Sequence, residues 1–92
     1  MITAFVFIQT DSDKIPEAAE KISAIPGISE VYSVTGDWDL IAIARVQHHE
    51  DLADVVADHL SKVEGVVETT THIAFRAYSR HDLEAAFSIG LE

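Results

Sequence analysis

The stretch that decides the fold is Val34-Thr35-Gly36-Asp37-Trp38-Asp39-Leu40, which joins two strand-like runs, Ile28 to Thr35 and Leu40 to Val46. Gly36 can adopt a positive φ, and the carboxylates of Asp37 and Asp39 can bond nearby backbone amides. The stretch therefore predicts a tight turn between two antiparallel strands. The second run has apolar residues at both its odd and its even positions, which is typical of a central strand covered on both faces.

The residues before this hairpin predict a strand followed by a helix. Ile2 to Thr10 is also apolar at both parities, so a second central strand is expected there. A helix is expected from Lys14 to Ala24, because apolar residues recur at helical spacing and the Asp11-Ser12-Asp13 run offers N-cap oxygens. Pro26-Gly27 should end that helix.

The residues after the hairpin repeat this pattern in reverse order. A second helix is expected to begin near His48 and to end at Gly65, with a buried apolar stripe along one side. A fourth strand is expected from Val66 to Ala77. A last stretch, Asp82 to Leu91, carries apolar residues at i, i+3 and i+4 and predicts a short amphipathic helix.

The element order β-α-β-β-α-β predicts a ferredoxin-like α+β fold, a four-stranded antiparallel sheet with two helices on one face. The strands Ile2 to Thr10 and Leu40 to Val46 should form its centre. Two helices cover only one face, yet both central strands are apolar on both faces, so the other face needs a partner. The simplest partner is a second copy, which predicts a sheet-to-sheet dimer.

Length and composition set further limits. At 92 residues the chain reads as one domain spanning residues 1–92, and it holds no cysteine for a disulfide, a thiolate nucleophile or a cysteine metal site. A net charge of -10 opposes direct DNA binding, since phosphate backbones are repelled. No apolar run reaches the roughly 18 residues of a membrane helix, and no basic leader precedes the first strand. We therefore expect a cytoplasmic protein without direct DNA or membrane contacts.

The hairpin and a downstream run together carry a family resemblance. The Gly36 to Leu40 segment, with Gly65-Val66 and the threonines Thr69 and Thr71, closely resembles the effector-binding (RAM) domain of Lrp/AsnC regulators from about Ile2 to Phe75. The resemblance implies a ferredoxin-like fold, sheet-to-sheet dimers that can assemble into rings, and an effector bound between subunits. Those regulators carry a helix-turn-helix before the first strand, so the chain looks like a stand-alone effector domain.

The resemblance also implies which residues bind the effector. It places the ligand beside the loop of Gly36, Asp37, Trp38 and Asp39, where backbone amides could bind a carboxylate and acidic side chains an ammonium group. The alternative is a solvated turn whose carboxylates satisfy local amides. Thr69 and Thr71 match threonines of the family's last strand, although threonine is also a common strand residue. Tyr32 could line the same interface or simply pack on an edge strand.

The five histidines do not indicate a metal site. His48 and His49 lack the i, i+4 spacing that puts two imidazoles on one helical face. His72 is expected to be a satisfied buried histidine of the last strand. The sequence shows no recognisable set of catalytic residues, so it predicts no enzyme activity, cofactor or metal.

These observations favour a homo-oligomeric sensor of an amino acid or related metabolite, which would regulate transcription through full-length Lrp/AsnC regulators. Two alternatives remain open. One is a dimeric ferredoxin-like barrel enzyme of the antibiotic-monooxygenase or haem-degrading type, with Trp38 and His72 in its pocket. The other is an oligomerisation module without a ligand.

Overall fold

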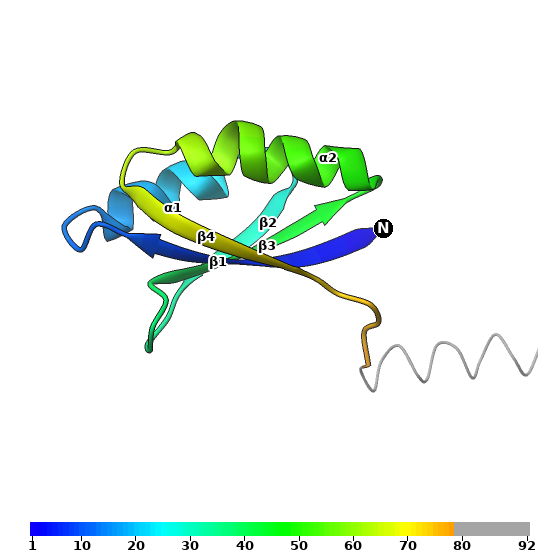
Figure 1. The fold of residues 1–92 in the computed structure, drawn as a ribbon, viewed down its shortest axis with the longest axis horizontal. Helices are drawn as coiled ribbons and strands as arrows, with labels where there is room; N and C mark the ends of the chain where they lie inside the picture. The colour runs from blue at the N-terminus through cyan, green and yellow to red at the C-terminus, as the bar shows by residue number, and fades with distance from the viewer. Residues whose placement is uncertain (79–92) are drawn as a thin grey trace, which may run out of the picture.

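The computed structural model of the chain describes residues 1–78. Its strands form one antiparallel sheet in the order β2-β3-β1-β4, and both helices lie on one face of that sheet (Figure 1). This arrangement confirms the ferredoxin-like fold and the central position of β1 and β3. The elements are β1 (Ile2–Thr10), α1 (Ile15–Ser23), β2 (Ile28–Ser33), β3 (Leu40–Val46), α2 (His49–Ala53) and β4 (Val66–Ile73).

The pairing register divides the sheet into two faces, because residues opposed in antiparallel strands share a face. Val6 opposes Ala42 on β3 and Thr71 on β4, and all three point toward the helices. Phe7, the next residue of β1, therefore points to the opposite side. We call that side the open face; on it lie Phe5, Phe7, Tyr32, Ile41, Ile43, Arg45, Thr70 and His72.

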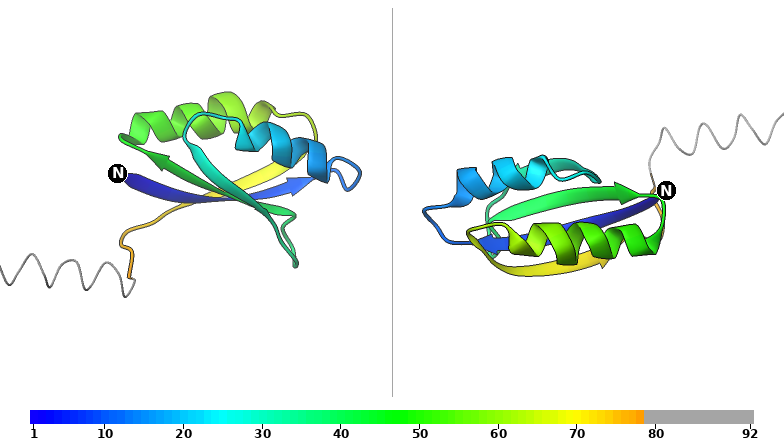
Figure 2. Two further views of the ribbon diagram at one scale, coloured as in Figure 1. Left: turned by 180° about the vertical axis from the view of Figure 1, so that it is seen from behind. Right: turned by 90° about the horizontal axis from the view of Figure 1, so that it is seen from above.

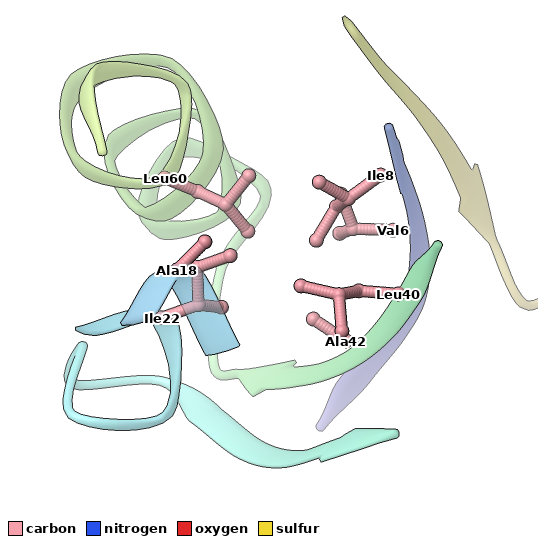
Figure 3. Close-up of a cluster of buried hydrophobic side chains, with 7 residues drawn as sticks. All are labelled: Val6, Ile8, Ala18, Ile22, Leu40, Ala42 and Leu60. Atoms are coloured by element: carbon pink, nitrogen blue, oxygen red, sulfur yellow. The ribbon is translucent and has the colours of Figure 1, made fainter. Parts of the chain in front are cut away.

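The core fills the space between the helices and the covered face of the sheet (Figure 3). Ile22 from α1 and Leu60 from the second helical segment point toward Ile8 of β1, and all three side chains are fully buried. Truncating one such side chain to alanine typically costs about 2–5 kcal/mol of unfolding free energy. The whole cluster consists of Val6, Ile8, Ala18, Ile22, Leu40, Ala42 and Leu60.

The second helical segment is not α-helical throughout. After α2 it continues as a π-helix over Asp54–His59 and ends in a 3-10 turn over Leu60–Lys62. Val55 and Leu60 are five apart, and both are buried against the sheet. Both side chains thus reach the core from one helical segment.

Two local expectations near the first helix and the hairpin were wrong. The N-cap position of α1 is Lys14, and no side chain caps it, so Asp11, Ser12 and Asp13 do not serve as the expected cap. A proline in the first turn removes one of the N–H groups that a cap would satisfy. The hairpin strand β2 ends at Ser33, earlier than Thr35.

The end of the chain also differs from expectation. Strand β4 ends at Ile73, and the expected strand to Ala77 was too long. Residues Ala74 to Tyr78 leave the sheet and cross to the open side, away from the helices (Figures 1 and 2). The helix expected from Asp82 to Leu91 lies outside the described residues. Within residues 1–78, no helix is long and apolar enough to span a membrane.

Candidate functional site

The loop between β2 and β3 is tied to the end of β1. Gly36 has a φ of 101°, as the turn expectation required. The backbone N–H of Val34 donates to the carbonyl of Asp39 at 3.1 Å and closes the hairpin. The N–H of Asp39 in turn donates to the carbonyl of Ile8 at 2.9 Å, which joins the loop to the sheet.

Side chains add two further ties between the loop and β1. The Oδ2 atom of Asp39 accepts a hydrogen bond from the backbone N–H of Thr10 at 2.9 Å. The Nε2 atom of Gln9 donates to the carbonyl of Asp37 at 3.1 Å. Among residues 1–78, the Oδ1 atom of Asp39 and both carboxylate oxygens of Asp37 receive no hydrogen bond. These oxygens remain available to a cationic group of a ligand.

Trp38 begins a row of three rings on the open face. Its ring centroid lies 6.0 Å from that of Phe7, with the planes tilted by 55°. Phe7 also meets the imidazole of His72 edge-on at 5.2 Å. The row runs from the loop across β1 to the edge strand β4, and it forms an apolar wall beside the loop.

The two expected threonines lie on the other side of the sheet. Thr69 opposes Ile8 and Thr71 opposes Val6, so both belong to the covered face. Thr71 also lines a groove under α2, together with Leu52. Within one chain the sheet therefore separates these threonines from Trp38. The threonine on the loop's face is Thr70, which opposes Phe7.

Tyr32 lies on the open face and is about half exposed. Its hydroxyl donates to the carboxylate of Glu30, which also accepts from Nη1 of Arg45 at 3.3 Å. The hydrogen bond from Tyr32, followed by that from Arg45, lowers the pKa of Glu30. The same bond to Glu30 raises the pKa of Tyr32, because it favours the protonated phenol.

Sequence reasoning overlooked Phe7 and Thr70 as neighbours of the loop, and it misplaced His72. His72 was expected to be buried, but it is exposed on the open face of an edge strand. The alternation of side chains along β1 could have placed Phe7 on the same face as the loop. The neighbours on β4, in contrast, depend on the register between strands that are distant in the sequence. In residues 1–78 no group of three or more His, Asp or Glu side chains is placed to hold a metal ion.

Comparison with known families gives one match over most of the chain. The Lrp/AsnC ligand binding domain matches residues 3–83. An uncharacterised helix-turn-helix-type transcriptional regulator of Pyrococcus horikoshii is 40% identical over 76 residues, which are 79% of this chain and 51% of that protein. The chain thus spans about half the length of the curated relatives it first matches.

Solved structures show the same fold. TTHA0845 of Thermus thermophilus is 46% identical with a TM-score of 0.82, over 87% of this chain and 100% of that one. A feast or famine regulatory protein of Mycobacterium tuberculosis, solved in complex with L-methionine, has a TM-score of 0.72 at 24% identity. That likeness covers 87% of this chain and 54% of the other, and at this identity it shows the fold alone.

Proposed function

The chain belongs to the Lrp/AsnC ligand-binding domain family, and from this premise we propose that it is a regulatory domain that binds a free amino acid or a related metabolite beside the loop of residues 34–39. The observation that carries the proposal is the fixed geometry of Asp39. Its backbone and Oδ2 are held by β1, while Oδ1 stays available. A carboxylate already positioned in this way can accept from a ligand ammonium group at little ordering cost.

The neighbours of Asp39 support the same ligand class. Gly36 presents an open backbone, since a side chain placed there would meet nothing within 4 Å. Trp38 and Phe7 supply an apolar wall for a side chain. An amino acid combines an ammonium group, a carboxylate and a side chain, and the loop offers one kind of partner for each.

We propose further that the complete site needs another copy of the chain. Thr69 and Thr71 cannot reach the loop of their own chain, because the sheet lies between them. A second protomer that pairs through its own open face would present Thr70, not Thr69 or Thr71, to this loop. Pairing is also favoured by the aromatic side chains of the open face, where Phe5 is 37% and Tyr32 51% exposed.

The proposed role is indirect control of transcription by a homo-oligomer without enzymatic activity. A net charge of -10 disfavours DNA as a direct partner. Full-length Lrp/AsnC regulators are the proposed partners, because shared sheet surfaces would let the two kinds of chain assemble together.

The test is a thermal-shift screen of the twenty amino acids against the native protein, since a ligand that binds the folded state raises Tm. For the amino acid that shifts Tm, Asp39→Asn should weaken binding about ten- to a hundredfold, because it removes the charge that pairs with the ammonium group. Asparagine can still accept the N–H of Thr10 through its amide oxygen, so this variant should stay folded.

The matched control is Asp58→Asn, which removes the same charge from an exposed helical position away from the loop. It should leave binding unchanged. If no amino acid shifts Tm at millimolar concentration, or if Asp39→Asn binds as the native protein does, the loop is not an effector site. The oligomerisation module would then be favoured, because Asp39 already has a structural role through its bond to Thr10.

A further inference from the structure

The outer edge of β4 presents backbone groups that no strand pairs with. Strand β4 ends the sheet order, so β1 is its one neighbour strand among residues 1–78 (Figure 2). The N–H of Ala74 donates to the carbonyl of Thr3 at 2.9 Å, so the polar backbone groups of Ala74 point toward β1. These groups alternate in direction along a strand, and those of Thr69, Thr71 and Ile73 therefore point outward. A further strand could pair with them.

The side chains at this edge also favour pairing. Lysine and proline commonly block exposed strand edges, and β4 contains neither residue type. Two large apolar side chains of β4 are exposed, Val67 at 64% and Ile73 at 49%. Thr71 and Ile73 line an apolar groove of about 310 Å³ under α2. Both residues belong to the covered face, so this groove lies apart from the open face.

The middle of β4 is complementary to itself in an antiparallel pair. When two copies pair with Thr70 opposite Thr70, each residue meets the one that lies equally far from Thr70 on the other side. Thr69 then lies opposite Thr71 of the partner subunit. Both residues point their backbone groups outward, so each such pair exchanges two N–H···O bonds. Two threonines opposite each other are also a favourable side-chain pair.

The flanking residues match in the same register. Glu68 meets His72 of the partner subunit, and a carboxylate can accept the N–H of an imidazole. Val67 comes beside Ile73 of the partner subunit, so two exposed apolar side chains cover each other. A register with Thr69 or Thr71 on the axis would separate both of these pairs. The complementarity therefore selects a second copy of this strand in one register.

We propose that two chains pair through the outer edges of their β4 strands, antiparallel and centred on Thr70. The two four-stranded sheets then join into one sheet of eight strands. The pair is two-fold symmetric, so the contact between Glu68 and His72 occurs twice. This edge is separate from the open face, and one chain can use both surfaces in a larger assembly.

The test is a cysteine at the axis of the pair. The chain has no cysteine of its own, so Thr70→Cys places a single thiol on each copy. The backbone groups of residue 70 point toward β1, and the two copies of Thr70 thus form a non-hydrogen-bonded pair. The Cα atoms of such a pair lie about 4.5 Å apart, which a disulfide can span. Mild oxidation of Thr70→Cys should therefore give a covalent dimer on a non-reducing gel.

The matched control is Ser29→Cys, an exposed position on the opposite edge strand β2. Thr70→Cys should cross-link at least about tenfold faster than this control, because only its thiols are held within disulfide distance. Chains stacked through their open faces alone keep their sheets about 10 Å apart, too far for this bond. Equal rates for the two variants, or no covalent dimer from Thr70→Cys, would overturn the proposal.

A proline tests the backbone bonds in the Thr70→Cys background. Thr71→Pro removes an outward N–H and leaves the bonds to β1 in place, so the chain should stay folded. It should lower the cross-linking rate to that of Ser29→Cys. Thermal denaturation checks the fold of this variant. A folded Thr71→Pro variant that still cross-links at the parent rate would contradict the pairing.

A charge swap tests the register in the same background. Glu68→Lys should slow cross-linking about tenfold, and the additional change His72→Glu should restore it. The two residues are four positions apart on one strand, so a rescue reports their contact between chains. Glu20→Lys makes the same charge change at an exposed position of α1 and should have no effect. Slowing by Glu20→Lys as large as by Glu68→Lys, or no rescue by His72→Glu, would rule out this register.

The pairing does not rest on the amino-acid site. That site is tested by a shift in Tm, and the edge pairing is tested by the rate of disulfide formation. Either proposal can therefore fail while the other holds.

Discussion

The carboxylate of Asp39 accepts the backbone N–H of Thr10 at 2.9 Å, so the residue that ends the hairpin loop also ties down the last residue of β1. The two residues belong to segments that are far apart along the chain. Their bond holds the loop at the edge of the sheet. It also means that a change at Asp39 affects both folding and the proposed ligand.

Asp39→Ala should lower the free energy of unfolding by about 1.5–3 kcal/mol, because the N–H of Thr10 loses a charged acceptor. Asp39→Asn should cost less, since one oxygen remains to accept that N–H. Urea denaturation followed by Trp38 fluorescence measures both values. Equal losses in the two variants would show that the bond to Thr10 contributes little to stability.

Thr10→Val is expected to leave stability unchanged or to raise it by about 1 kcal/mol. Thr10 is 9% exposed, and its hydroxyl has no hydrogen-bond partner among the described residues. Valine has nearly the same shape and buries no polar atom. A clear loss of stability in thermal denaturation would mean that the hydroxyl has a partner in solution.

Gly27→Ala should destabilise the fold more than Gly36→Ala. Both glycines have positive φ, 99° and 101°, so both variants incur backbone strain of about 1–2 kcal/mol. A Cβ at Gly27 would also lie 2.8 Å from Cγ2 of Val55, whereas one at Gly36 would meet nothing within 4 Å. Overpacking of this kind adds about 1–3 kcal/mol. Equal midpoints in urea would contradict the close contact at Gly27.

The hydrogen bond between Tyr32 and Glu30 should make the stability of the fold depend on pH in both the acidic and the alkaline range. The lowered pKa of Glu30 stabilises the fold above the pKa it has when unfolded, and this contribution is lost as pH falls through its folded pKa. The raised pKa of Tyr32 stabilises the fold at pH values below the unfolded pKa, which is near 10.0. This stabilisation is lost as pH rises through the folded pKa.

An ultraviolet titration of tyrosinate checks the second effect. In a Tyr78→Phe background Tyr32 is the remaining tyrosine, since the chain has two. Its ionisation should shift to lower pH when Glu30→Gln is added. An unchanged titration curve would rule out the hydrogen bond between the two side chains.

The open face should pair with a second copy at micromolar protein concentration. Standard specific interfaces bury about 1,600 Å² in total, and a four-stranded sheet face offers an area of that order. Light scattering of the native protein should therefore give at least twice the chain mass of 10.1 kDa. A stable monomer would contradict both the pairing and the proposed two-copy site.

Local sequence patterns by themselves determined where most elements lie. The expected bounds of β1 and β3 agree with the structure, because strands covered on both faces are apolar at both parities. Gly36 was identified as the turn residue because positive φ restricts the choice of side chain. These features depend on neighbours in the chain, and the sequence displays them directly.

Only the tertiary structure decided which distant residues meet. The register of β4 against β1 places Thr70 and His72 beside Phe7 and turns Thr69 and Thr71 to the covered face. A shift of one residue would reverse that assignment, and strand composition alone does not specify it. The bond from Thr10 to Asp39 likewise depends on strand pairing. Contacts between distant segments arise from packing, which no local pattern encodes.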